Sequence, residues 1–340
     1  MKNFIKKPLL TAIVLILIII TIFYLQKNTP KIQSLKVDKE TNYIKAPEIT
    51  GISNWINSKP LTIKGLKGNV VMIDFWTYTC INCIRTLPHL NDWYEKYKDK
   101  GLVIIGIHSP EFEFEKNYDN VLNAVKQYNI KYPVAQDNNY DVWSSYGNRF
   151  WPHEYLIDIN GNLRYDHIGE GNYDETEKEI QNLLKERDKN LNIGLTSENN
   201  NFDSIKIGTP EIYLGYKTSR GNFGNQEGFQ PDQVVGYKIP NDIQANKVYL
   251  SGEWKNNEDN LELIGNEGTI LLKYKAKNAN IVASAVNSLV DVNLDNKNIK
   301  NFKVIEPKLY VASETEDYGE YTLMLNIKNP GFKIYTFTFG

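Results

Sequence analysis

The chain has 340 residues, more than one typical domain needs, so two folded domains with additional segments are expected. Its formal net charge is −2 with lysines and acids interspersed, which leaves no basic surface for a nucleic acid and excludes that class of partner. Its two cysteines are too few for disulfides to stabilise the fold as a whole, so the pair has a local purpose.

The first predicted element is an apolar segment from Leu9 to Leu25, which follows a short basic tail. Its length can just span a bilayer. The residues at its end are poor candidates for cleavage and include no cysteine for a lipid, so an uncleaved signal anchor is favoured over a cleaved signal peptide or a buried core helix. We therefore assign residues 1–27 to a cytoplasmic tail and anchor and residues 28–45 to a membrane-proximal spacer. The tail favours an N-terminus inside the cell, although lysines after the segment weaken that asymmetry.

Strands and helices alternate in the prediction for residues 46–188. Val70 to Trp76 is a continuous apolar run, which is typical of a central strand covered on both faces. Gly101 ends the helix that follows. Asp174 with Glu177 resembles a capping box at the start of the last helix. The other predicted elements are a strand at 102–107, helices at 117–129 and 140–146, and a hairpin of strands at 154–157 and 163–168. This order predicts an α/β domain with the thioredoxin arrangement.

Cys80 and Cys83 lie where the first strand meets its helix. A cysteine in the first turn of a helix faces unpaired backbone N–H groups and the positive end of the dipole, which favours the thiolate. Cys80 is then the nucleophile, and Cys83 resolves the mixed disulfide by forming a Cys80–Cys83 disulfide. The alternatives are a structural disulfide, which would close a very short loop, a zinc site completed by histidines, or two inert thiols. We expect no metal, and no cofactor besides the redox-active disulfide.

Several segments are similar to the DipZ-type branch of the TlpA-like thioredoxins. They are FWTYTCINCIRTLPHL at 75–90, HSPEFEFE at 108–115, YGNRFWP at 146–152 and GEGNYD at 169–174. The resemblance extends from about residue 45 to the C-terminus. It implies thiol–disulfide exchange by a membrane-tethered enzyme in the periplasm or an equivalent extracytoplasmic space.

The resemblance also implies a substrate surface beside Cys80. The active-site proline of this superfamily is cis, so Trp151 and Pro152 are expected to present a backbone strand to the substrate. An ordinary loop proline is the alternative. Trp76 and Tyr78 flank the cysteines and are expected to shape the same surface.

Two acids are candidates for proton transfer. Glu111 stands where related enzymes carry a semi-buried acid, which could shuttle the proton of Cys83. Alternatively, it belongs to a solvated loop face together with Glu113 and Glu115. Asp74 is the second candidate, although its side chain could point to solvent or to Lys67.

Complete DipZ proteins carry a multi-span membrane domain, whereas this sequence has one apolar segment. If the chain is a reductase, a separate membrane electron donor of the CcdA or DsbD type is expected to recharge it. Its clients are expected to be protein disulfides or thiols, with cytochrome c maturation or envelope redox homeostasis as the process. The sequence leaves the direction of exchange open.

Residues 189–208 are rich in asparagine and predict a linker. Beyond them, residues 209–340 contain short alternating segments that predict an all-β sandwich. The predicted strands are 270–275, 281–285, 289–294, 308–312, 321–327 and 335–339.

This second domain resembles the C-terminal β module of DipZ-like proteins in TPEIYLGY at 209–216, LSGEW at 250–254 and YTFTFG at 335–340. The module looks like a jelly-roll carbohydrate-binding module, which implies a glycan ligand only by analogy. Its Tyr213, Tyr216 and Trp254 form either a stacking platform or packing in the core or between domains.

A different class of function is also considered. The chain could be an envelope glycan- or protein-binding module whose thioredoxin domain is a non-catalytic scaffold. The presence of Cys80, Cys83 and Pro152 argues against this alternative, because a scaffold needs none of them.

Overall fold

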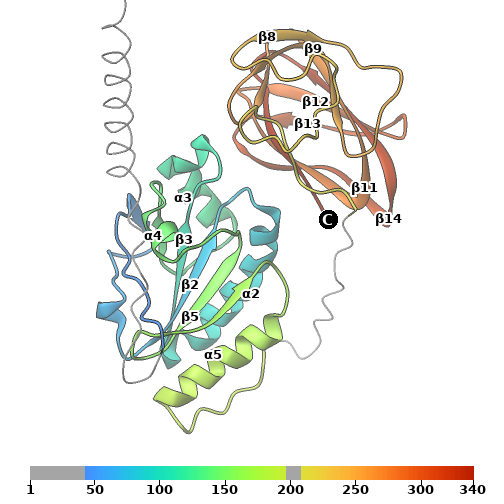
Figure 1. The fold of residues 1–340 in the computed structure, drawn as a ribbon. Coiled ribbons are helices and arrows are strands. Elements are labelled where there is room, and N and C mark those ends of the chain that lie inside the picture. Colours follow the sequence, from blue (N-terminus) through green and yellow to red (C-terminus); the bar gives the residue numbers. More distant parts are fainter. Residues whose placement is uncertain (1–42, 197–207) are drawn as a thin grey trace, which may run out of the picture.

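The computed structural model describes residues 43–196 and 208–340, which form an α/β region and a β region, respectively (Figure 1). The predicted signal anchor, most of the spacer and part of the linker lie outside the described residues. Within the two described ranges, no helix is long and apolar enough to cross a membrane.

A six-stranded sheet with the order β1-β4-β3-β2-β5-β6 forms the centre of the α/β region. The central strand β2 pairs in parallel with β3 and antiparallel with β5, and every residue of β2 is buried. The continuous apolar run at 70–76 therefore forms the covered strand that its pattern predicts. The strands are β1 (Asn54–Ile56), β2 (Val70–Trp76), β3 (Leu102–His108), β4 (Val134–Gln136), β5 (His153–Ile157) and β6 (Leu163–Ile168).

Helices cover both faces of this sheet (Figure 1). Residues of α2, α3 and α5 pack with Met72 and Trp76 of β2 in one core, whereas Val142 of α4 packs with Ile73 and Phe75 in a second core. Alternate residues of a strand point to opposite faces, so the two cores lie on opposite sides of the sheet. Together with the order of the strands, this arrangement confirms the predicted thioredoxin-type fold. The helices are α2 (Ile81–Tyr97), α3 (Tyr118–Gln127), α4 (Asp141–Ser145) and α5 (Tyr173–Arg187), with 3-10 helices at Lys64–Leu66, Lys98–Lys100 and Glu113–Lys116.

The end of α2 depends on a glycine. A 3-10 turn continues from α2 and ends at Gly101, whose φ of 100° is left-handed. A Cβ at this position would lie 2.7 Å from the guanidinium of Arg187. Glycine is therefore favoured here both by the backbone conformation and by the space.

The start of α5 differs from the prediction. Asn172 is its N-cap and makes no capping hydrogen bond with its side chain, so the capping box of Asp174 and Glu177 is wrong. Glu177 is buried instead and accepts hydrogen bonds from Lys96 Nζ at 2.8 Å and Tyr97 Oη at 2.6 Å. The Glu177 carboxylate therefore bonds side chains distant in sequence and does not form the helix cap that the local pattern predicts.

The β region contains no helix among its described residues and has one continuous core. Strand β11 pairs with three other strands of the sheet: with β14 along most of its length, with β9 near its start and with β15 near its end. The structure thus confirms an all-β C-terminal region. The strands are β7 (Ile212–Tyr213), β8 (Val234–Tyr237), β9 (Val248–Asn256), β10 (Leu261–Leu263), β11 (Glu267–Ser284), β12 (Ser288–Leu294), β13 (Lys297–Val304), β14 (Lys308–Lys328) and β15 (Lys333–Phe339).

Two pairs of predicted strands in this region are wrong because each pair is one strand. Segments 270–275 and 281–285 belong to β11, and segments 308–312 and 321–327 belong to β14. The pairing of β11 with β14 shifts register between Ala276 and Asn278, so the strand continues through a polar stretch by way of a bulge.

Candidate active site

Cys80 occupies the N-cap position of α2. Its backbone is extended, and its sulfur accepts a hydrogen bond from the backbone N–H of Cys83 at 3.2 Å. The sulfur is half-buried and lies at the positive end of the helix dipole, where negative charge is stabilised. This is the placement that a nucleophilic thiolate requires.

Cys83 lies one turn further along α2 and is only 1% exposed. Burial and the neighbouring sulfur of Cys80 raise the pKa of its thiol well above the ordinary value. Both cysteines are free thiols in this structure. The pair therefore combines one reachable sulfur with one that is covered and protonated.

A buried carboxylate lies near Cys83. Asp74 is on the face of β2 that carries Met72 and Trp76, and its charge contributes to the raised pKa of Cys83. Its side chain is 1% exposed, and neither of its oxygens has a hydrogen-bond partner among the described residues. Burial raises the pKa of Asp74 to about 8. The alternative that Asp74 points to solvent or to Lys67 is therefore wrong.

A second buried acid, which sequence reasoning missed, lies beside Asp74. Glu154 of β5 is directly opposite Asp74 in the antiparallel register, so the two side chains share a face of the sheet. Glu154 is also 1% exposed and without a hydrogen-bond partner in the described chain. Burial and then Asp74 raise its pKa well above the ordinary value. The sequence signal that could have identified Glu154 is its position two residues before Leu156, on the same face of an apolar strand.

The loop from Pro110 to Lys116 is fastened to the active site by Glu115. This side chain is fully buried and accepts a hydrogen bond from Thr79 Oγ1 at 2.5 Å. It also accepts from the backbone N–H groups of Glu111 and Phe112, at 2.5 and 2.9 Å. The expectation of a solvated loop face is wrong for Glu115 because its carboxylate is the anchor of the loop. It holds for Glu113, which is exposed and pairs with Lys116.

Glu111 is half-buried and lines a cavity together with Cys80. Burial and the charge of Glu115 raise its pKa to about 8, while a hydrogen bond from Tyr213 acts in the opposite direction. Tyr213 Oη donates to Glu111 Oε1 at 2.6 Å. A cavity of about 40 Å³ is shared by Thr79, Cys80, Glu111, Trp151, Glu211, Tyr213, Thr336 and Thr338.

Of the four residues assigned to a substrate surface, Trp151 alone lines the cavity with Cys80. Trp151 is half-buried at the cavity, Pro152 is buried, and the peptide bond between them is cis. Trp76 is fully buried under the helices, so its assignment to a substrate surface is wrong. Tyr78 is 4% exposed and donates to the carbonyl of Pro307 at 3.2 Å, so the β region covers it and the same assignment is wrong for Tyr78.

Of the two alternatives for Tyr213, Tyr216 and Trp254, the stacking platform is wrong for Tyr213 and Trp254. Trp254 is fully buried in the core of that region, and Tyr213 is 9% exposed and faces Glu111. Tyr216 is half-buried and donates to Asp232 at 3.1 Å. Packing in the core and between regions is therefore the role that the structure gives to Trp254 and Tyr213.

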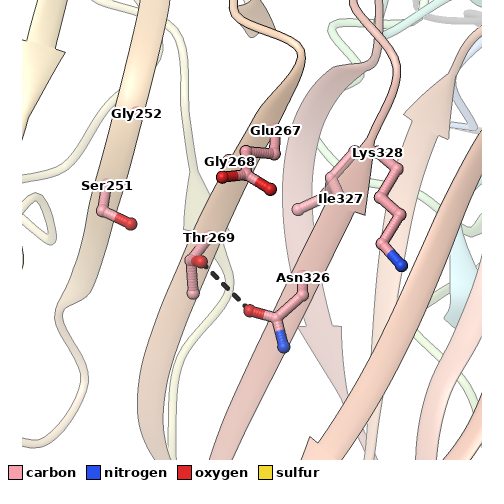
Figure 2. Close-up of a pocket in the computed structure, with 8 residues that line it drawn as sticks. All are labelled: Ser251, Gly252, Glu267, Gly268, Thr269, Asn326, Ile327 and Lys328. Atoms are coloured by element: carbon pink, nitrogen blue, oxygen red, sulfur yellow. Dashed lines mark hydrogen bonds between the residues drawn. The ribbon is translucent and has the colours of Figure 1, made fainter.

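A larger cavity of about 310 Å³ lies in the β region, away from the cysteines. Figure 2 shows polar side chains along it, with Thr269 donating to Asn326 Oδ1 at 3.0 Å. Its lining residues are Ser251, Gly252, Glu267, Gly268, Thr269, Asn326, Ile327 and Lys328. Across both described regions, no group of three His, Cys, Asp or Glu side chains is arranged to hold a metal ion.

Each of the two regions matches a different known protein family. Residues 44–166 match the AhpC/TSA family, and residues 209–340 match the thioredoxin-like C-terminal domain family. Protein DipZ of Mycobacterium bovis is 36% identical over 300 residues, which is 87% of this chain and 43% of DipZ. The thiol-disulfide oxidoreductase ResA of Bacillus thuringiensis is 32% identical over 153 residues, which is 45% of this chain and 83% of ResA. A solution structure of a thioredoxin-like protein in the oxidised form aligns at 26% identity with a TM-score of 0.40, over 42% of this chain and 97% of that protein.

The two relatives match different parts of the chain. The match to DipZ runs through both regions, although the aligned part is less than half of DipZ itself. ResA is matched over most of its own length. The chain belongs to the family of the thiol-disulfide oxidoreductase ResA, and its similarity to protein DipZ extends through both described regions.

Proposed function

We propose that the chain is a membrane-anchored thiol–disulfide oxidoreductase that acts outside the cytoplasm, with Cys80 as the nucleophile and Cys83 as the resolving thiol. The observation that carries this proposal is the asymmetry of the pair, because Cys80 is half-buried at the start of α2 whereas Cys83 is sealed one turn further along. The apolar segment from Leu9 to Leu25 supports the anchor.

In the reducing direction, the Cys80 thiolate attacks one sulfur of a client disulfide. A bond forms between Cys80 and that sulfur, and the second client sulfur leaves as a thiolate that takes up a proton. Cys83 then loses its proton and attacks Cys80, which releases the first client sulfur. Two electrons have moved from the dithiol to the client, and the enzyme holds the Cys80–Cys83 disulfide.

The proton of Cys83 needs an acceptor in a covered site. Asp74 is suited to this role because it lies on the same side of the sheet and burial brings its pKa to about 8, within the range where a base works efficiently near neutral pH. Glu111 is suited to proton transfer beside Cys80, because it lines the cavity with the Cys80 sulfur and its pKa is also about 8.

Client proteins are proposed to bind across Trp151, which lines the cavity with Cys80, and the cis Pro152 that follows it. A membrane electron donor of the CcdA or DsbD type is proposed to return the enzyme to the dithiol form. Cytochrome c maturation or envelope redox homeostasis is the proposed process, and the redox potential decides whether reduction or oxidation is favoured.

The test is a redox titration of the purified full-length chain in detergent. Mixtures of reduced and oxidised glutathione are equilibrated with the protein, and free thiols are counted after acid quenching. With two cysteines in the chain, the count is unambiguous. We expect one reversible two-electron transition, which is lost in Cys80→Ser while the circular dichroism spectrum is kept. A chain whose thiols remain unoxidised, or oxidise irreversibly, contradicts the proposal.

Glycan binding by the β region is a second proposal, favoured by the polar cavity in Figure 2. Its Glu267, Asn326 and Lys328 side chains line this cavity and carry groups that hydrogen-bond sugar hydroxyls. Titration calorimetry with soluble peptidoglycan fragments tests it on the full chain. Saturable binding that is weakened in Asn326→Ala, with redox behaviour unchanged, supports a glycan ligand, and absence of saturable binding contradicts it.

A further inference from the structure

The β region packs directly against the active-site loop of the α/β region. Phe112 of that loop is buried in one apolar cluster with Tyr213, Val282 and Tyr335 of the β region. The ring of Phe114 meets Tyr335 edge-on, with centroids 4.8 Å apart. Buried aromatic contacts of this kind fix the position of the β region beside the cysteines.

At this interface, Tyr213 contacts an acid of the redox site. Its hydroxyl lies 2.6 Å from Glu111 Oε1 and 3.2 Å from Glu211 Oε2. A phenol has one proton to donate, and the shorter contact is the one to Glu111. The guanidinium of Arg220 lies over the Tyr213 ring, 4.7 Å from its centroid, and further restrains the side chain.

We propose that Tyr213 is a positioning residue for Glu111, so that the β region completes the redox site instead of serving only as an appended module. The inference rests on the proposed thiol–disulfide exchange. Tyr213 holds the Glu111 carboxyl at the wall of the cavity that also contains the Cys80 sulfur, and it stabilises the charged form of that carboxyl.

The surroundings of Glu111 determine the sign of the effect. Burial and the charges of Glu115 and Glu211 raise the pKa of Glu111, whereas the hydrogen bond from Tyr213 and the charge of Arg220 lower it. Loss of the phenol therefore moves the pKa of Glu111 further upward. The titratable and charged groups that face this carboxyl are Cys80 in the shared cavity, Glu115 of its own loop, Tyr140 near α4, and Glu211, Tyr213 and Arg220 of the β region.

Tyr213→Phe removes the hydroxyl and little else. The ring remains available to the apolar cluster with Phe112, and the backbone pairing of Tyr213 with Thr336 in β15 does not involve the side chain. The matched control is Tyr216→Phe, because Tyr216 is three residues further along and bonds Asp232 instead of an active-site acid.

The experiment measures the rate at which the reduced full-length chain reduces a disulfide-bonded peptide, between pH 5.5 and 9.5. Glu111→Gln first identifies the limb of the pH profile that belongs to Glu111. In Tyr213→Phe we expect the midpoint of that limb to rise by about one pH unit, as the loss of a hydrogen bond to a charged group implies. Tyr216→Phe should leave the midpoint unchanged, and Tyr213→Phe should add nothing in the Glu111→Gln background.

An unmoved midpoint in a folded Tyr213→Phe variant overturns the inference, as does an equal effect of Tyr213→Phe with and without Glu111. In either case exchange by the wild-type chain would still support the proposed function. Absence of exchange by the wild-type chain at every pH would instead refute the proposed function and this inference together.

Discussion

Replacement of Asp74 by asparagine is expected to stabilise the α/β region increasingly as the pH rises. The folded-state pKa of about 8 lies above the ordinary value of 3.8, so between these values the unfolded chain is ionised while the folded chain keeps its proton. The unfolded state then binds fewer protons, and the free energy of unfolding falls as the pH rises. Asparagine has the same shape and no such dependence.

The magnitude follows from the size of this shift. Each pH unit inside the window costs about 1.4 kcal/mol, so the ionisable side chain lowers the free energy of unfolding by about 4 kcal/mol at pH 7 relative to pH 3.8. Asp74 is 1% exposed, so bulk solvent screens its charge little. The difference between Asp74→Asn and the wild type should therefore grow by roughly 3 kcal/mol from pH 5.5 to pH 7.5.

Urea unfolding followed by helical circular dichroism measures this difference, since the helices of the described chain all belong to the α/β region. The matched control is Asp92→Asn on the exposed side of α2, which should change stability by less than about 0.5 kcal/mol at either pH. An Asp74→Asn variant whose advantage does not grow with pH would refute the reasoning. The same variant should also resolve mixed disulfides more slowly, by on the order of 100-fold, because Cys83 has lost its proton acceptor.

Two further predictions concern the loop and the client surface. Glu115→Gln should lower the free energy of unfolding by about 1–3 kcal/mol at pH 7, because it weakens the buried hydrogen bonds from Thr79 and from the loop backbone. The control Glu113→Gln changes an exposed side chain and should alter the free energy of unfolding little. Equal effects of the two variants in urea titrations would contradict the role of Glu115 as the anchor of the loop. Trp151→Ala should raise the KM for a disulfide-bonded peptide roughly tenfold and leave kcat nearly unchanged. Phe150 is 48% exposed, and the control Phe150→Ala should leave KM unchanged. A loss confined to kcat in Trp151→Ala would argue against contact between Trp151 and the client.

The α/β fold could be predicted from the sequence because its main elements have distinct patterns. The apolar run at 70–76, the helical spacing after Cys83 and Gly101 at the end of the helix each specify an element locally. The three-residue strands β1 and β4 could not be predicted, since they are too short to show a period and form by pairing with strands distant in sequence. The long strands β11 and β14 were divided in the prediction because polar residues interrupt their apolar pattern.

Only those site residues that lie together in one segment of the sequence could be predicted. The sequence places Cys80 and Cys83 at a helix start, but burial depends on the face of β2, so Trp76 is hidden although it lies close to Cys80 in the chain. Glu154 and Tyr213 reach the site from β5 and β7 through pairing and packing that no local pattern records.

The most direct test of the redox mechanism is trapping of the mixed disulfide. Full-length Cys83→Ser and Cys80→Ser variants are incubated with a disulfide-bonded peptide, quenched in acid and analysed by mass spectrometry. The structure predicts a stable adduct on Cys80 in Cys83→Ser, because the attacking sulfur is reachable and the resolving thiol is gone, and little adduct on the buried Cys83 in Cys80→Ser. Equal trapping by both variants, or none by Cys83→Ser, would contradict the assignment of Cys80 as the nucleophile.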